Sequence, residues 1–153
     1  MVNRRQKSKA FTAIEFAVVL LIAMLVFMTV TPAVMKMVDI TKSKTTTDEI
    51  EDIQFDIDKF FKDNGRFPDS LEEVFGETPL DPWGNPYLYI NHINMKGKGQ
   101  MRKDKNLVPI NSDYDLYSAG PDGQSASPLT AALSQDDIIR GRNGAFIGYA
   151  IDY

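Results

Sequence analysis

The chain has 153 residues, enough for one modest domain and one long apolar element, and it contains no cysteine. Its formal net charge is −4, but the first ten residues hold four of the 17 basic residues and no acidic residue, so the remainder carries −8. Such an acidic body excludes nucleic acid as an expected partner, because phosphate binding needs a positive field. Without disulfides, stability has to come from packing or from a bound metal ion.

The first predicted element is an apolar helix near the N-terminus. Residues 16–35 contain no charged side chain, and twenty residues in a helix cross a hydrocarbon layer of about 30 Å. Because basic residues precede this run, residues 1–10 are predicted to lie in the cytoplasm and the rest of the chain across the membrane. A secretory signal peptide would have a shorter apolar run, whereas an ordinary single-pass anchor fits this pattern equally well.

A carboxylate, Glu15, stands at the head of the apolar run. An ionised acid at the edge of an apolar helix is costly, so it is usually paired or functional. The nearest cations are Lys9 and Lys36, one on each side of the run. The pattern therefore predicts a partner for Glu15 from outside its own helix.

The stretch AFTAIEF at 10–16, after a short basic leader, resembles the processing motif of type IV pilins and pseudopilins. The resemblance implies that a prepilin peptidase cleaves between Ala10 and Phe11 and methylates the new amino group of Phe11. It also implies that Glu15, then the fifth residue, meets the N-terminus of a neighbouring subunit. Pro32 matches a proline that commonly kinks the helix in this family. The family normally has glycine where this chain has Ala10.

Elementary electrostatics supports this arrangement. Cleavage would create an ammonium group at Phe11 that can neutralise Glu15 of an adjacent copy. An unpaired charge in an apolar bundle should cost several kcal/mol, so the pairing would fix the axial register between subunits. Pro32 lacks an N–H and frees the carbonyl of Met28, which permits the helix to bend there.

The helix is predicted to continue as an amphipathic segment to about Lys62. Apolar residues recur on one helical face at Ile50, Ile53, Ile57, Phe60 and Phe61. Acidic residues fill most other positions and are interpreted as a solvated face; a metal site or an acid–base pair is the alternative. Asn64-Gly65 is typical of a helix C-terminus. One continuous helix over 11–62 would be about 78 Å long.

Beyond the helix the pattern changes to turns and short strands. A short helical piece is predicted over 70–75, capped by Asp69 or Ser70. Strands are predicted over 88–90, 114–117 and 145–151, with a doubtful edge element over 107–110. The expected fold class is therefore α+β, a long N-terminal helix packed on a small antiparallel sheet, as in pilins.

Three further motifs resemble the major pseudopilin of type II secretion systems: GRFP at 65–68, DPWGNPYLY at 81–89 and DYDLYSAGPDG at 113–123. The resemblance implies a subunit anchored in the inner membrane, with its globular domain and its filament in the periplasm. Its implied partners are copies of itself, minor pseudopilins, the inner-membrane assembly platform and the prepilin peptidase. The DPWGNPY block is interpreted as structural, with buried aromatic rings on a tight path, rather than as a ligand site.

The predicted organisation has four parts. These are a cleaved leader (1–10), a transmembrane and polymerisation helix (11–41), the amphipathic half of the helix (42–64) and a small α+β domain (65–153).

The same resemblance implies a Ca²⁺ site between the loop after the second strand and the acids before the final segment. The matching positions are the Leu116 carbonyl, Ser118, Asp122, Asp136 and Asp137. Ca²⁺ takes six to eight oxygen ligands, many of them backbone carbonyls. The loop is longer than the family pattern and holds Ser-Pro-Leu at 127–129. The alternative is that residues 121–123 are only a turn and Asp136 caps a helix.

Residues 96–105 carry five positive charges and are interpreted as an exposed connection. A sharper hypothesis is that this segment meets the acidic helix face of the next subunit.

Enzyme chemistry is thinly supplied. His92 is the only histidine, and HExxH, P-loop and GxSxG motifs are absent from the sequence, so no enzymatic activity is expected. Two other functions remain open: a major or minor type IV pilin of a surface pilus, and a membrane-tethered binding domain that does not polymerise. The lack of a C-terminal cysteine pair favours the pseudopilin.

Overall fold

The structure, a computed structural model, describes residues 12–95 and 97–153. The chain divides into two compact units, one that ends at Val38 and one that starts at Asp39. Helix α1 (Ala13–Asn64) supplies the described helix of the first unit and continues into the second. The division lies three residues before the boundary predicted between the two halves of this helix.

Helix α1 ends where the sequence predicts. Gly65 takes a left-handed conformation with φ of +71°, and its N–H donates to the Phe61 carbonyl at 2.8 Å. A glycine reaches this conformation without steric cost and so closes the last helical turn. Phe61 is more exposed than its place in the apolar pattern suggests, because it stacks on Phe67 at the edge of the core, with the ring centroids 4.5 Å apart.

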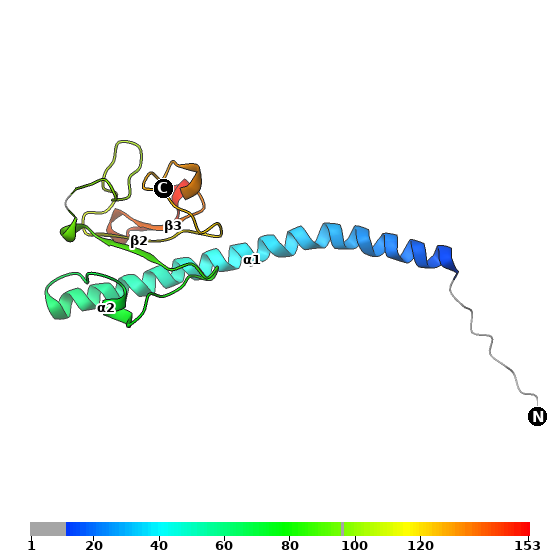
Figure 1. Cartoon of the computed structure of the whole chain (residues 1–153), viewed down its shortest axis with the longest axis horizontal. Coiled ribbons are helices and arrows are strands. Elements are labelled where there is room, and N and C mark those ends of the chain that lie inside the picture. Colours follow the sequence, from blue (N-terminus) through cyan, green and yellow to red (C-terminus); the bar gives the residue numbers. More distant parts are fainter. Residues whose placement is uncertain (1–11, 96) are drawn as a thin grey trace, which may run out of the picture. The chain divides into compact units, whose positions relative to one another are not determined.

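The second unit contains a four-stranded antiparallel sheet in the order β1-β2-β3-β4 (Figure 1). Its strands are β1 (Leu88–Asn91), β2 (Tyr114–Ser118), β3 (Ile138–Gly141) and β4 (Phe146–Tyr149). In register, Leu88 faces Tyr117, Tyr117 faces Ile139, and Ile139 faces Gly148. The predicted α+β class is confirmed, as are the strands that became β1, β2 and β4.

Two details of the predicted globular half are wrong. Residues 107–110 lie in a loop, where Asp104 and Leu107 exchange backbone hydrogen bonds across a tight turn. Helix α2 (Glu72–Phe75) begins after Leu71, and within the described residues no side chain caps it. Asp69 instead donates its backbone N–H to the Glu73 carboxylate at 2.8 Å.

The main core lies between the sheet and the second part of α1. The helix buries Ile50, Ile53 and Ile57 against a sheet face that presents Tyr114 and Leu116 from β2 and Ile138 from β3. Because side chains alternate along a strand, Asp115, Tyr117 and Ile139 point to the opposite face. A second cluster of Ile110, Leu129, Ile139 and Ala150 covers that face.

Polar contacts also join α1 to the globular part of this unit. The Tyr87 hydroxyl donates to the Glu49 carboxylate at 2.6 Å, and the Tyr149 hydroxyl of β4 contacts the Ser43 hydroxyl. Burial and the nearby Glu49 carboxylate both raise the pKa of Tyr87, so this phenol stays protonated and keeps donating.

Candidate functional site

The first unit presents an apolar helix surface that the described chain leaves uncovered. Every residue from Thr12 to Val38 is exposed except Thr31, which is half-buried, and the Phe27 side chain is 71% exposed. Among the described residues, α1 is the one helix with the length and composition of a membrane span. Exposed apolar area on this scale marks a surface for lipid or for other protein.

Glu15 closes a capping box at the start of α1. Its carboxylate accepts hydrogen bonds from the Thr12 backbone N–H and from the Thr12 hydroxyl, both at 2.8 Å. In return the Glu15 N–H donates to the Thr12 hydroxyl oxygen at 3.3 Å. This reciprocal pattern is a common device for satisfying the free donors of a first helical turn. Both donors to the carboxylate are uncharged, so the negative charge of Glu15 is solvated but not neutralised.

Pro32 lies within α1, which continues on both sides of it. The hydroxyl of Thr31 donates to the Phe27 carbonyl at 2.7 Å, and that of Thr29 reaches the Val26 carbonyl at 3.0 Å. Such back-bonding satisfies the hydroxyls inside an apolar helix. Pro32 therefore lies within the predicted membrane segment, directly after Thr31, whose hydroxyl is hydrogen-bonded within the same helix.

The predicted processing residues Ala10 and Phe11 lie outside the described residues. Cleavage between them and methylation of Phe11 stay predictions.

The DPWGNPY block forms a tight turn organised by one buried acid. Asp81 accepts the backbone N–H groups of Trp83 at 3.0 Å and Asn85 at 2.9 Å. Gly84 closes the turn with φ of +93°, a conformation that favours glycine. The second oxygen of Asp81 accepts the Ser118 hydroxyl at 2.6 Å. These contacts give the block the structural role that the sequence predicted.

The five residues predicted to bind calcium fall into different surroundings. Leu116 lies inside β2 opposite Tyr89, and the Ser118 hydroxyl is engaged by Asp81. Asp122 is exposed, and one of its oxygens accepts the Gln124 N–H at 2.7 Å. Asp136 lies close to Gly120: a Cβ atom added to this glycine would clash with the Asp136 backbone carbonyl and lie 3.1 Å from the Asp136 carboxylate.

Asp137, the remaining predicted calcium ligand, is buried in an ion pair. Its Oδ2 lies 2.5 Å from Arg102 Nη2 and accepts the Ser125 hydroxyl at 2.6 Å. Its Oδ1 has no hydrogen-bond partner within the described chain. Burial raises the pKa of the Asp137 carboxyl above its usual value, although the bonds from Ser125 and Arg102 act in the opposite direction.

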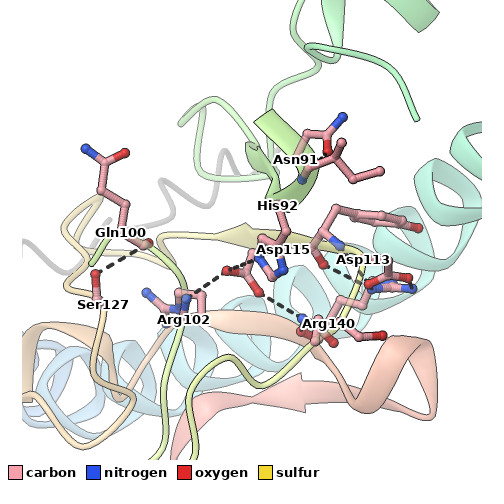
Figure 2. Close-up of polar contacts among 12 residues, drawn as sticks. Asn91, His92, Gln100, Arg102, Asp113, Asp115, Ser127 and Arg140 are labelled. Carbon is pink, nitrogen blue, oxygen red and sulfur yellow. Dashed lines mark hydrogen bonds and ion pairs between the residues drawn. The ribbon is translucent and has the colours of Figure 1, made fainter. Parts of the chain in front are cut away.

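Arg102 overturns the interpretation of residues 96–105 as a wholly exposed connection. The residue is 1% exposed, and its Nη1 donates to the Ser125 hydroxyl at 2.5 Å and to the Ala126 carbonyl at 2.7 Å. Its guanidinium carbon lies 4.2 Å from the centroid of the Tyr117 ring. Its backbone N–H donates to Asp115 at 2.7 Å, a bond within the polar network drawn in Figure 2.

The same network holds the only histidine. His92 Nε2 lies 3.0 Å from Asp115 Oδ2, a pair that is ionic only when the imidazole is protonated. The ring N–H groups are not aligned for hydrogen bonds with any described residue. The other Asp115 oxygen accepts Asn111 Nδ2 at 2.9 Å.

The sequence patterns did not predict a second buried arginine, Arg140 of β3. It donates to both carboxylate oxygens of Asp113, at 2.9 and 2.8 Å, and its Nε donates to Gln54 of α1 at 2.7 Å. Burial alone would raise the pKa of Asp113, but the bonds from Arg140 and from the Tyr114 N–H hold it below its usual value. Figure 2 labels both residues of this pair.

The described donors do not fit a calcium ion as they are arranged. Ca²⁺ needs six to eight oxygens, yet Asp137 faces a guanidinium and Ser118 donates to another acid. Among the described residues, no group of three or more His, Cys, Asp or Glu side chains could hold a metal ion. Calcium binding stays a prediction from the resemblance.

A helix that is apolar in its first part and packed on an antiparallel sheet in its second is the arrangement that the sequence predicts for a pilin-like fold. The chain is similar to the type II secretion system core protein G of Pseudomonas aeruginosa. The two are 28% identical over 144 residues, which cover 80% of this chain and 89% of that protein. No family model matches the chain, and no solved structure matches it. The predicted resemblance to a type II secretion protein is confirmed.

Proposed function

We propose that this chain is a structural subunit of a type II secretion filament, anchored in the inner membrane and polymerised through the first part of α1. The observation that carries the proposal is the uncovered apolar surface from Thr12 to Val38. Such a surface is stable in lipid before assembly and among copies of itself afterwards. The similarity to the Pseudomonas core protein G favours secretion over a surface pilus.

The proposed topology follows from charge. The basic residues 1–10 stay in the cytoplasm, the apolar part of α1 crosses the inner membrane once, and the second unit lies in the periplasm. A prepilin peptidase removes the leader between Ala10 and Phe11 and methylates the new amine. Copies of the chain then form the filament, together with minor pseudopilins and the inner-membrane assembly platform. The role is structural rather than enzymatic.

Glu15 is the proposed assembly contact. An ionised carboxylate has about four acceptor positions, of which the Thr12 donors occupy two on one oxygen. The other oxygen and the net charge remain available to the Phe11 ammonium of a neighbouring copy. The capping box therefore holds the acid in place for the neighbour, and the charge pair forms when the helices come together.

The substitution Glu15→Gln tests this proposal in the full chain. The substitution keeps the size of the side chain and much of its capacity to accept hydrogen bonds from Thr12, but it removes the charge. We expect normal membrane insertion and at least a tenfold loss of filament, since an uncompensated charge among apolar helices costs several kcal/mol. Filament yield by electron microscopy and membrane fractionation measure the two effects separately.

The control is Glu51→Gln, which removes the same charge from the exposed face of α1 in the second unit. The intact mass of each mature chain reports whether the leader was removed and Phe11 methylated, which separates failed processing from failed assembly. Filaments at wild-type yield from a correctly processed Glu15→Gln chain would show that Glu15 is not the assembly contact. A correctly processed wild-type chain that forms no filaments would leave the membrane-tethered binding domain as the better account.

A further inference from the structure

The segment between β2 and β3, residues 119–137, is long and has little regular structure. Within it only Ala132–Ser134 form a single 3-10 turn. Loops of this length without secondary structure of their own are uncommon in compact domains, so the contacts that order this loop need an explanation. The residues that contact it from outside therefore show what holds it.

Asn85 Nδ2 donates to the Gly120 carbonyl at 2.9 Å and the Ala150 N–H donates to the Asp137 carbonyl at 2.9 Å, near the two ends of the loop. Between these ends, the outside contacts come from the segment around Arg102. Lys103 donates its backbone N–H to the Ser127 carbonyl at 3.0 Å and accepts the Leu129 N–H at 2.9 Å, so the two segments run side by side. Arg102 is fixed in turn, because its N–H donates to Asp115 and its carbonyl accepts the Ile110 N–H at 3.1 Å. A backbone anchored to the sheet thus carries the guanidinium into the loop.

The guanidinium closes the loop on itself. Arg102 Nη1 donates to Ser125 and Ala126 near the middle of the loop, while Nη2 meets Asp137 at its end. Ser125 completes a triangle, since its hydroxyl accepts from Arg102 and donates to Asp137 Oδ2. A buried carboxylate needs an opposite charge and several donors, and this arrangement supplies both from within the chain.

We propose that Arg102 is a built-in cation that orders the loop 119–137, so that this loop does not require the divalent ion implied by the resemblance. A dication at Asp137 would lie against the guanidinium and would have to expel it. The unpartnered Asp137 Oδ1 and the unpartnered Arg102 Nε, both judged against the described residues, belong to this same ion pair. The proposal holds whether or not the chain forms filaments.

The test uses the full chain in detergent, with melting followed by near-ultraviolet circular dichroism in excess CaCl₂ or in excess EDTA. The wild type should melt within about 1 °C in the two solutions, while Arg102→Gln should melt more than about 5 °C lower in both. Limited proteolysis read by mass spectrometry should show faster cutting within 119–137 in Arg102→Gln and no effect of EDTA on the wild type. The matched control is Lys103→Gln, which removes the same charge from the adjacent, half-exposed residue.

A wild-type melting temperature that rises by more than about 3 °C in calcium, or a loop that EDTA opens to protease, overturns the proposal. So does an Arg102→Gln chain as stable as the wild type in EDTA. Should Arg102→Gln fail to fold, the wild-type comparison decides alone, and Arg102→Lys adds a variant that keeps the charge but loses the fork of donors.

Discussion

Two buried arginines of the second unit each meet a carboxylate, on opposite faces of the sheet. Arg140 meets Asp113 on the face toward α1, and Arg102 meets Asp137 on the opposite face. Each guanidinium also lies over a tyrosine ring, at 4.0 Å for Arg140 and 4.2 Å for Arg102. Planar cations stack on aromatic faces while their edges donate to carboxylates. Removing one partner of such a pair is costly because the other charge stays buried.

Asp113→Asn should therefore destabilise the chain by about 3 kcal/mol near neutral pH, since Arg140 loses its counter-charge. The pKa of Asp113 is lower in the folded state than in the unfolded state. The ion pair therefore stabilises the fold fully at pH values above the unfolded-state pKa. Its contribution is lost as pH falls through the folded pKa. The difference in the free energy of unfolding between wild type and Asp113→Asn should accordingly become smaller as pH drops from about 7 to about 2.5. Urea unfolding across this range measures the gap.

Glu73→Gln provides the comparison for that prediction. It breaks the more exposed pair with Arg66, where solvent screening should leave a much smaller effect on stability than that of Asp113→Asn. A gap between wild type and Asp113→Asn that stays constant across the acid range would show that the ion pair is not its source.

For single residues, the sequence alone identifies some charged residues with a special role and misses others. Glu15 stood out because an acid beside an apolar run is anomalous within its own neighbourhood. Arg102 did not, because it lies in a basic run and is distinguished from Lys103 by contacts with residues distant in the chain, such as Asp137, 35 residues later. Local patterns record chemistry that is unusual locally, and they miss charges whose partners are distant in the chain.

Among the elements, the second part of α1 contributes the largest share of the core. Ile57 is fully buried between the helix and the sheet, whereas Phe55 on the same helix is 68% exposed. Ile57→Ala should cost about 2–5 kcal/mol through lost burial and the cavity left behind. Phe55→Ala, although it removes a larger side chain, should change stability by less than about 1 kcal/mol. Denaturant midpoints of both variants measure the contrast, and equal losses would contradict the proposed core face.

The elements also show where sequence patterns suffice. The isoleucine spacing and Asn64-Gly65 correctly predicted the core face and the end of α1, because both are local signals. Strand β3 was not predicted, since Arg140 interrupts a short apolar run and reads as a surface residue. Its burial depends on Asp113, which the sheet brings beside it from β2's N-terminal edge. The strand could be identified only once that pairing was known.

At the scale of the whole molecule, the two units are built for different surroundings. The cores of the second unit draw on residues 50–150, and from Thr12 to Val38 no described side chain is buried. The apolar part of α1 therefore adds surface without adding to the fold. Lipid or neighbouring copies in a filament can cover the apolar surface of the first unit. Neither environment needs to change the core of the second unit.

A chain without residues 1–38 should accordingly be a soluble monomer that melts within about 2 °C of the full chain in detergent, because no core contact is removed. Asp39 would then fall in the first helical turn, where a negative charge is favourable, and its carbonyl would still accept the Ser43 hydroxyl at 2.8 Å. A chain without residues 1–49 is the matched control. It loses Ser43, buried Thr46 and the Glu49 partner of Tyr87, and it should melt more than about 5 °C lower. Sedimentation and circular dichroism without detergent measure both chains, and aggregation of the longer one would show that the second unit depends on the first.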